Sequence, residues 1–218
     1  MRTIYNDEVR LPVDDVVLYG QLAIPDGAEA LVIFAHGTGS SRFSPRNQYV
    51  AERLQQRGYA TLLFDLLTNA ENQIYFNSFE IDLLASRLIS VTNWATAGMI
   101  TSGMIIGYFG ASTGAAAALI AAAELPDKVL AVVSRGGRPD LTGDALEKVH
   151  AAVLLLVGGL DTAVIDLNRQ AMDQIDAPSE LTIVPEATHL FEEPGKLDEV
   201  ADYALEWFSK YLKTEVPL

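Results

Sequence analysis

The chain of 218 residues contains no cysteine. This absence excludes disulfide bonds, thiolate metal sites and cysteine nucleophiles. Basic residues are also scarce, because 15 Lys and Arg stand against 29 Asp and Glu and give a formal net charge of −14. Binding to nucleic acid or to an anionic membrane surface needs clustered basic side chains, so we expect neither partner. A small-molecule substrate is the simpler expectation.

Segments that would direct the chain to a membrane are not evident in the sequence. Residues 1–15 carry four acidic side chains and no apolar run, so we expect no signal peptide and a cytoplasmic location. No charged residue occurs between Arg87 and Glu124, but glycines and polar side chains interrupt that stretch. A buried strand, a turn and a buried helix explain the same absence of charge.

Patterns typical of strands and helices alternate along the chain. Short apolar runs rich in β-branched residues predict strands at 16–24, 30–35, 59–64, 104–109, 129–133, 152–157 and 181–184. Capping residues and helical periodicity predict helices at 45–57, 79–97, 113–125, 163–175 and 197–212. The pair Asp14-Asp15 predicts a hairpin turn and therefore antiparallel strands at the start. The repeated β-then-α order predicts one α/β domain over 1–218, with a mostly parallel central sheet covered by helices on both faces.

A G-x-S-x-G motif, Gly110-Ala111-Ser112-Thr113-Gly114, lies between a predicted strand and an alanine-rich predicted helix. In that context the motif predicts a nucleophile elbow, a tight turn that presents the serine above the sheet. Glycines at the flanking positions leave room for the turn, and the helix amino terminus favours a nearby oxyanion. The alternative is a serine that merely caps a helix.

A nucleophilic serine needs a base, and the base needs an orienting carboxylate. Of three histidines, only His189 follows the last predicted strand, which suits the chain order serine, acid, histidine. Asp161 follows the strand at 152–157 and should lie at the same sheet edge as Ser112. A hydrogen-bonded loop histidine remains the alternative for His189. The alternatives to Asp161 are Asp140, Asp166 and Glu186.

The loop 36–41, His36-Gly37-Thr38-Gly39-Ser40-Ser41, follows an early predicted strand. In elbow-type hydrolases such a loop supplies a backbone N–H to the oxyanion hole. We assign the N–H groups of Thr38 and Thr113 to that role. Gly39 is the competitor for the first position, because a difference of one residue changes which N–H points inward.

Together these stretches resemble the dienelactone hydrolase family of small α/β-hydrolases over nearly the whole chain. The segments that carry the resemblance are His36-Gly37-Thr38-Gly39-Ser40-Ser41, Gly110-Ala111-Ser112-Thr113-Gly114, Ser134-Arg135-Gly136-Gly137-Arg138-Pro139, Gly158-Gly159-Leu160-Asp161 and Ala187-Thr188-His189. The resemblance implies an α/β-hydrolase fold. Dienelactone hydrolases proper use a cysteine nucleophile where this chain has Ser112, so the implied activity is that of a serine carboxylesterase on small esters.

The substrate pocket is less defined by the sequence. Cap domains of this fold usually follow the strand that ends near Ser134, but 135–150 has room for only one short helix, so we expect no cap domain and an open crevice. The connection 66–77 is either an apolar wall that includes Leu66 and Tyr75 or a packed surface loop. Arg135 and Arg138 either bind a substrate carboxylate or, as we favour, form salt bridges to Asp140 or Asp144. Arg42 and Arg46 have the same two alternatives, a substrate carboxylate or a salt bridge.

Ester hydrolysis through an acyl-serine intermediate is therefore the leading hypothesis. The alternatives are acyl transfer, thioester or amide cleavage by the same residues, and a non-catalytic binding module on this fold. The mechanism calls for no metal or organic cofactor. Oligomeric state stays open between monomer and homodimer.

Overall fold

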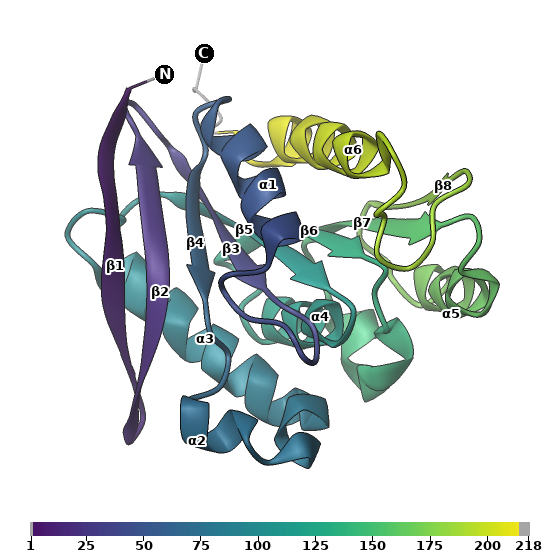
Figure 1. The fold of residues 1–218 in the computed structure, drawn as a ribbon, viewed down its shortest axis with the longest axis horizontal. Helices are drawn as coiled ribbons and strands as arrows, with labels where there is room; N and C mark the ends of the chain where they lie inside the picture. The colour runs from purple at the N-terminus through teal and green to yellow at the C-terminus, as the bar shows by residue number, and fades with distance from the viewer. Residues whose placement is uncertain (1, 214–218) are drawn as a thin grey trace.

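The computed structural model describes residues 2–213, in which eight strands form one sheet (Figure 1). Its strand order is β1-β2-β4-β3-β5-β6-β7-β8. β1 pairs antiparallel with β2 and β2 with β4, whereas all the remaining neighbours are parallel. The predicted α/β-hydrolase architecture is confirmed. The strands are β1 (Thr3–Val13), β2 (Val16–Pro25), β3 (Ala30–Ala35), β4 (Ala60–Phe64), β5 (Ile105–Ala111), β6 (Val129–Arg135), β7 (Ala152–Gly158) and β8 (Ser179–Val184).

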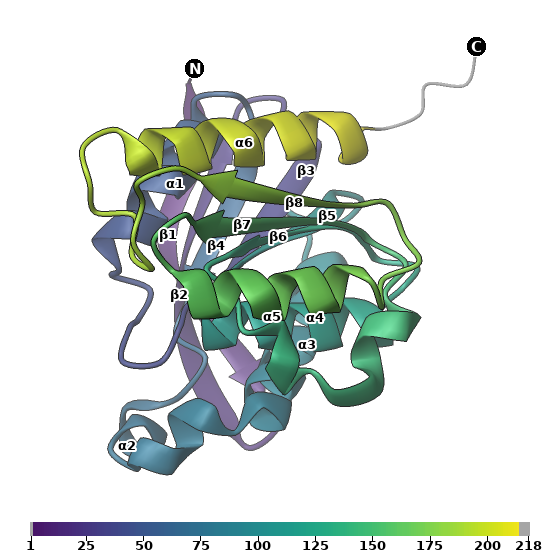
Figure 2. The same ribbon diagram turned by 90° about the vertical axis from the view of Figure 1, so that its right-hand side faces the viewer.

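Helices cover both faces of this sheet. Figures 1 and 2 show α1 and α6 on one face and α3, α4 and α5 on the other. The α-helices are α1 (Pro45–Gln55), α2 (Asn69–Asn72), α3 (Ile81–Ala97), α4 (Thr113–Glu124), α5 (Thr162–Met172) and α6 (Lys196–Tyr211). Short 3-10 helices are η1 (Tyr75–Phe79), η2 (Pro139–Leu141) and η3 (Gly143–Lys148).

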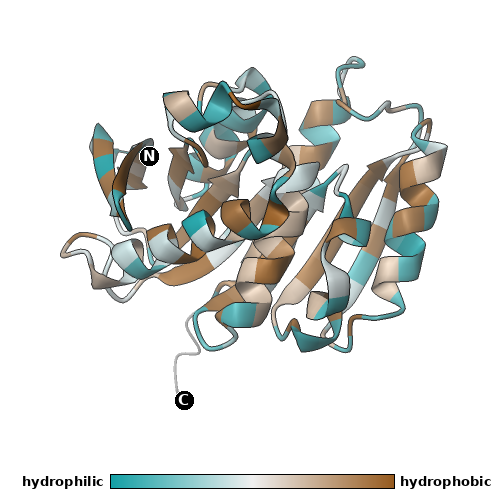
Figure 3. Cartoon of the chain, turned by 90° about the horizontal axis from the view of Figure 1, so that it is seen from below, coloured by the Kyte–Doolittle hydropathy of each residue, from teal (hydrophilic) through white to brown (hydrophobic). Residues whose placement is uncertain are grey.

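The core is divided by the sheet into two layers. Along β3, Leu31 and Ile33 face the layer under α3 and α4, whereas Val32 and Phe34 face the layer under α1 and α6. This alternation follows from the two-residue period of a strand. Because helices cover the sheet on both faces, every residue of β3 is apolar and buried. In Figure 3 the central strands are coloured largely brown, the colour of hydrophobic residues.

The amino-terminal hairpin turns at the predicted pair Asp14-Asp15. Val13 pairs with Val16, so the connection is a two-residue turn, and Asp14 takes a positive φ of 50°. Such turns need left-handed backbone, which aspartate tolerates better than most residues. The hairpin prediction is thus confirmed, although the sequence did not define the length of β1.

Several predicted boundaries are wrong by a few residues. α3 begins at Ile81 rather than Phe79, because the chain up to Phe79 belongs to η1. The segment 135–150 forms η2 and η3 instead of one short helix, and its brevity agrees with the absence of a cap domain. Within residues 2–213, no helix is long and apolar enough to cross a membrane.

Candidate active site

The carboxyl ends of the parallel strands bring the predicted site residues to one edge of the sheet. Ser112 follows β5, Asp161 follows β7, and His189 lies beyond the end of β8. Arg135 is the last residue of β6. Ligands of open α/β sheets bind at this edge.

Ser112 occupies the strained turn that the motif predicts. Its φ of 52° and ψ of −120° lie outside the conformations that residues with a side chain favour. The backbone around it is held in place, because Ser112 N–H donates to the carbonyl of Arg135 at 3.1 Å and the Ser112 carbonyl accepts from Ala115 N–H at 3.0 Å. The serine therefore stands at the N-cap of α4, where its hydroxyl makes no capping bond.

Contacts around the elbow explain its two glycines. A Cβ atom on Gly114 would lie 2.3 Å from the carbonyl oxygen of Ala35 and 2.4 Å from that of His36. A Cβ atom on Gly110 would lie 2.5 Å from Ala115 Cα. Only glycine lets α4 start this close to the end of β3.

His189 is oriented by Asp161. The distance between His189 Nδ1 and Asp161 Oδ2 is 2.6 Å, and the carboxylate is the more buried of the two side chains. Since an ionised carboxylate only accepts hydrogen bonds, Nδ1 carries the proton and Nε2 is left as the acceptor. Two of the three alternatives to Asp161 have other partners, because Asp140 pairs with Arg138 and Asp166 pairs with Arg169.

Backbone bonds between two loops place Asp161 beside His189. Leu160 N–H donates to the carbonyl of Ala187 at 2.9 Å, and Gly159 N–H donates to that of Val184 at 2.8 Å. The loop after β7 is thus fastened to the loop after β8. Thr188 N–H donates to the carboxylate of Glu193 at 3.1 Å, which fixes the residue next to the histidine.

Ser112 and His189 line one cavity of about 160 Å³. A cavity of this size suits a compact ligand, since drug-sized ligands need roughly 300–1,000 Å³. The lining includes Arg46, for which the sequence left both alternatives open, and also Asn47 and Leu190, which sequence reasoning did not assign to the pocket. No local signal marks them, because α1 and the loop after His189 reach the cavity only through the tertiary fold. Its full lining is Gly37, Thr38, Ser40, Arg46, Asn47, Ala111, Ser112, Arg135, His189 and Leu190.

His36, which follows β3, links the ends of β3 and β4 through a hydrogen bond. Leu66 N–H donates to His36 Nε2 at 3.1 Å, so Nδ1 carries the proton and lies 3.0 Å from the Gly37 carbonyl. Burial lowers the pKa of His36, and this effect outweighs the opposing influence of the Gly37 hydrogen bond and the Asp65 charge. His36 is thus a neutral, structural histidine.

The backbone N–H of Thr38, a predicted oxyanion donor, donates instead to Thr113 Oγ1 at 2.9 Å. The Thr38 hydroxyl donates to the Ser78 carbonyl at 2.8 Å and so ties the loop to η1. The N–H of Thr113 stands in the first turn of α4, where a helix offers it no internal partner. Gly39, the competitor for Thr38, does not line the Ser112 cavity.

Three pocket assignments made from the sequence are not supported by the structure. Leu66 has no exposed surface and belongs to the core, so it cannot form the predicted apolar wall. Tyr75 is 70% exposed and lies outside the lining of the Ser112 cavity. Arg138 forms a bidentate pair with Asp140, with N···O distances of 2.8 and 2.7 Å, as the favoured alternative predicted. That pair lowers the pKa of Asp140.

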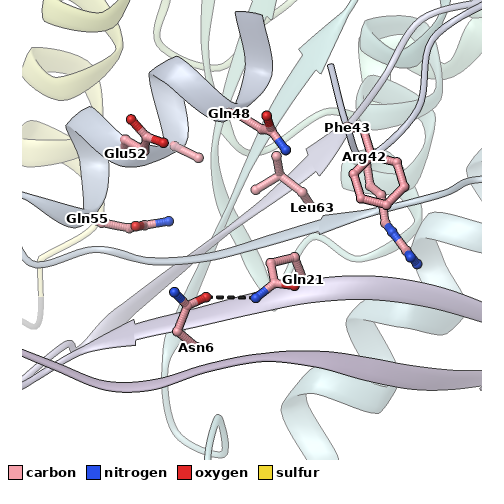
Figure 4. Close-up of a pocket in the computed structure, with 9 residues that line it drawn as sticks. Asn6, Gln21, Arg42, Phe43, Gln48, Glu52, Gln55 and Leu63 are labelled. Carbon is pink, nitrogen blue, oxygen red and sulfur yellow. Dashed lines mark hydrogen bonds between the residues drawn. The ribbon is translucent and has the colours of Figure 1, made fainter. Parts of the chain in front are cut away.

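A second cavity, of about 280 Å³, opens between α1 and strands β2 and β4 (Figure 4). Its lining includes the amide side chains of Asn6, Gln21, Gln48 and Gln55, and Gln21 donates to Asn6 at 2.7 Å. Neither Ser112, Asp161 nor His189 lines it. The cavity at Ser112, although smaller, is therefore the candidate active site.

The fold and this site define an α/β-hydrolase. The sequence model of the dienelactone hydrolase family matches residues 18–214, and the chain belongs to that family. It is also similar to a crystal structure of a dienelactone hydrolase from Anabaena variabilis, with 54% identity and a TM-score of 0.93 over 96% of this chain and 99% of that one. Est1E from Butyrivibrio proteoclasticus, at 17% identity and a TM-score of 0.77 over 93% of this chain and 99% of that one, shares the fold.

Curated relatives from two strains of Mycobacterium tuberculosis bear the name "Putative phosphoribosyl transferase". They are 54% identical over 207 residues, which make up 95% of this chain and 47% of theirs. The chain thus spans about half the length of these relatives.

Proposed function

We propose that this protein is a serine hydrolase that cleaves small carboxylic esters through an acyl-serine intermediate. The observation that carries the proposal is the 2.6 Å contact between His189 Nδ1 and Asp161 Oδ2 at a cavity that Ser112 also lines. A strained serine, a histidine whose Nε2 makes no hydrogen bond within residues 2–213 and a partly buried carboxylate are the parts that nucleophilic acyl transfer requires.

In the proposed reaction, His189 Nε2 takes the proton of Ser112 as Oγ attacks the ester carbonyl carbon. The same proton then passes to the departing alcohol oxygen, which leaves an acyl group on Oγ. Water repeats the sequence and releases the acid. Asp161 keeps Nδ1 protonated and stabilises the imidazolium that forms in each half-reaction.

The developing oxyanion needs donors beside Ser112. The N–H of Thr113 at the start of α4 supplies one in this proposal, aided by the helix dipole. The N–H of Thr38 supplies the second once the Thr113 hydroxyl, which accepts its hydrogen bond in the free protein, turns away. Removal of one such donor typically costs about 10²–10³ in kcat.

The name of the mycobacterial relatives does not change this proposal. It describes a chain about twice as long, of which this one matches 47%. The family assignment and the arrangement at Ser112 are properties of this chain. No contact described above favours phosphoribosyl transfer. Acyl transfer or thioester cleavage would use the same residues, and product analysis with added alcohols or thiols separates these reactions from hydrolysis.

The test is hydrolysis of short-chain p-nitrophenyl esters by the wild-type protein and by Ser112→Ala. We expect turnover by the wild type and a loss of at least about 10³-fold in kcat in the variant. Ser209→Ala, an exposed serine on α6, is the matched control and should retain wild-type rates. Equal rates in wild type and Ser112→Ala would contradict the proposal.

A further inference from the structure

The cavity between α1 and strands β2 and β4 has no part in the reaction proposed above. This α1 cavity has a volume of about 280 Å³, larger than the 160 Å³ of the cavity at Ser112. Four of its lining residues come from α1 and are spaced as i, i+3, i+4 and i+7, so they share one face of the helix. These residues are Gln48, Ala51, Glu52 and Gln55. Figure 4 shows them opposite the side chains of β1 and β2.

A different side of α1 carries the charges that hold the helix to its neighbour. Arg53 pairs with Asp198 and Asp202 of α6, at N···O distances of 2.9 and 2.6 Å. The side toward the cavity instead presents the two amides of Gln48 and Gln55. Helix attachment therefore does not require the amide side, which leaves that side available for a ligand.

Hydrogen bonds orient some of the amides around the cavity. Gln21 Nε2 donates to Asn6 Oδ1 at 2.7 Å (Figure 4), and Gln55 Nε2 donates to the buried Thr61 hydroxyl at 2.7 Å. Within residues 2–213, the side chains of Gln48 and Glu52 make no hydrogen bond or ion pair, although both line the cavity. Since a primary amide both donates and accepts, the cavity offers donors and acceptors side by side.

Apolar surface completes the lining. Ala51 and Leu63 are buried residues that reach the cavity from α1 and β4. Phe43 is 62% exposed, and the guanidinium carbon of Arg42 lies 4.6 Å from the centroid of its ring. Arg42 is itself held by Glu8 at 2.6 Å. The cavity thus combines an apolar base and an aromatic ring with several neutral polar groups.

The charges at the cavity favour a neutral ligand. The positive charge of Arg42 is already compensated, because Glu8 and Asp65 lie 2.6 and 3.6 Å from its guanidinium nitrogens. The unpaired carboxylate of Glu52 repels an anion, as does the net charge of −14. A cation would have only Glu52 as a charged partner and would meet Arg42 in the same cavity.

We propose that the α1 cavity binds a neutral saccharide unit. Each sugar hydroxyl both donates and accepts a hydrogen bond, which matches the amides and the Glu52 carboxylate. The CH groups of the sugar ring pack against Ala51, Leu63 and the ring of Phe43. A volume of about 280 Å³ lies just below the range of roughly 300–1,000 Å³ for drug-sized ligands, so it suits one sugar ring. This binding does not depend on the chemistry at Ser112.

NMR titration of the ¹⁵N-labelled protein tests the proposal. The probes are the methyl glycosides of glucose, galactose, mannose and xylose, with n-butylammonium and butyrate as charged comparisons. We expect at least one glycoside to bind with a Kd of about 10 mM or tighter and to shift the amide signals of Gln48, Ala51 and Leu63. The two charged probes should bind this cavity at least tenfold more weakly.

Substitutions on the exposed part of α1 locate the binding. Gln48→Ala and Glu52→Ala remove side chains without a protein partner in the described residues and should weaken glycoside binding by about 3–10-fold and tenfold or more. Gln56→Ala is the matched control, because Gln56 is an exposed glutamine at the C-cap of α1 and lies outside the cavity lining. It should keep the wild-type Kd.

Three results would overturn the inference. These are no binding of any of the four glycosides, binding that Gln48→Ala and Glu52→Ala leave unchanged, or tighter binding of a charged probe in this cavity. Each result is independent of ester hydrolysis. A wild-type protein that binds a glycoside at the α1 cavity but does not cleave esters would support this inference and refute the proposed function.

Discussion

His36 and His189 both carry the ring proton on Nδ1, but the two histidines differ in what their Nε2 atoms contact. The Leu66 N–H points at Nε2 of His36, so that ring is held as the Nδ1–H tautomer between two strand ends. Asp161 lies at Nδ1 of His189, and in the described part of the chain, residues 2–213, no donor reaches Nε2. Chain position alone suggested His189 as the base, and the hydrogen bonds now give His36 a different, structural role.

The neutral state of the partly buried His36 predicts a pH dependence of stability. Its folded pKa lies below the ordinary value of about 6.5, so the unfolded chain binds more protons as the pH falls below that value. The free energy of unfolding contributed by His36 is therefore complete above about pH 6.5 and is lost below it, by at most about 1.4 kcal/mol per pH unit. Urea unfolding at pH 7.5, 6.5 and 5.5 measures the loss.

The variant His36→Gln isolates this contribution, because glutamine can accept from Leu66 N–H and does not titrate. We expect a smaller fall in the free energy of unfolding between pH 7.5 and 5.5 than in the wild type. His150→Gln removes an exposed histidine and should keep the wild-type dependence. If His36→Gln and wild type lose equal stability over this range, the assignment of a neutral, hydrogen-bonded His36 is wrong.

At the scale of elements, the elbow depends on how closely α4 approaches the end of β3. We expect Gly114→Ala to lower the free energy of unfolding by more than about 3 kcal/mol, because the added methyl would meet two backbone carbonyl oxygens that cannot move aside. The distances are 2.3 and 2.4 Å to the Ala35 and His36 oxygens. Thermal and urea denaturation measure the change.

Gly27→Ala is the matched control. Gly27 has a positive φ of 73° and no atom within 4 Å of an added Cβ, so only backbone strain of about 1–2 kcal/mol applies. A Gly114→Ala protein as stable as Gly27→Ala would mean that α4 can shift and that the elbow is not tightly packed.

The connection between β4 and α3 shows a limit of sequence interpretation. Its apolar residues predicted either a pocket wall or a packed loop, and burial decides between them residue by residue. Leu66 is in the core, whereas Tyr75 and Phe76 are exposed on η1 and stack edge to face at 6.0 Å. Apolar character alone could not separate these outcomes, because they depend on how α2 and η1 fold back.

For the whole molecule, the sheet and the order of site residues could be predicted from the sequence. Apolar strand runs have a period and length that reflect burial, and the carboxyl ends of parallel strands must meet at one edge. That rule placed Ser112, Asp161 and His189 correctly relative to the sheet. A single domain, a cytoplasmic location and the oligomeric state stay predictions.

Arg135, the last residue of β6, and Arg138, which follows that strand, show which contacts the sequence could not predict. Arg138 pairs with Asp140, two residues away, and a contact this local can be predicted from the sequence. Arg135 instead lies against the ring of Phe191, which comes from the loop after β8, with the guanidinium carbon 5.9 Å from the ring centroid. Long-range packing of this kind leaves no pattern in one sequence.

The most direct test of the central claim is covalent labelling with a fluorophosphonate, followed by peptide mapping. The account predicts one adduct, on Ser112, which is absent in Ser112→Ala and forms much more slowly in His189→Ala because the base no longer accepts the proton. Absence of labelling in the folded wild type, or an adduct on another serine, would contradict the claim that Ser112 is an activated nucleophile.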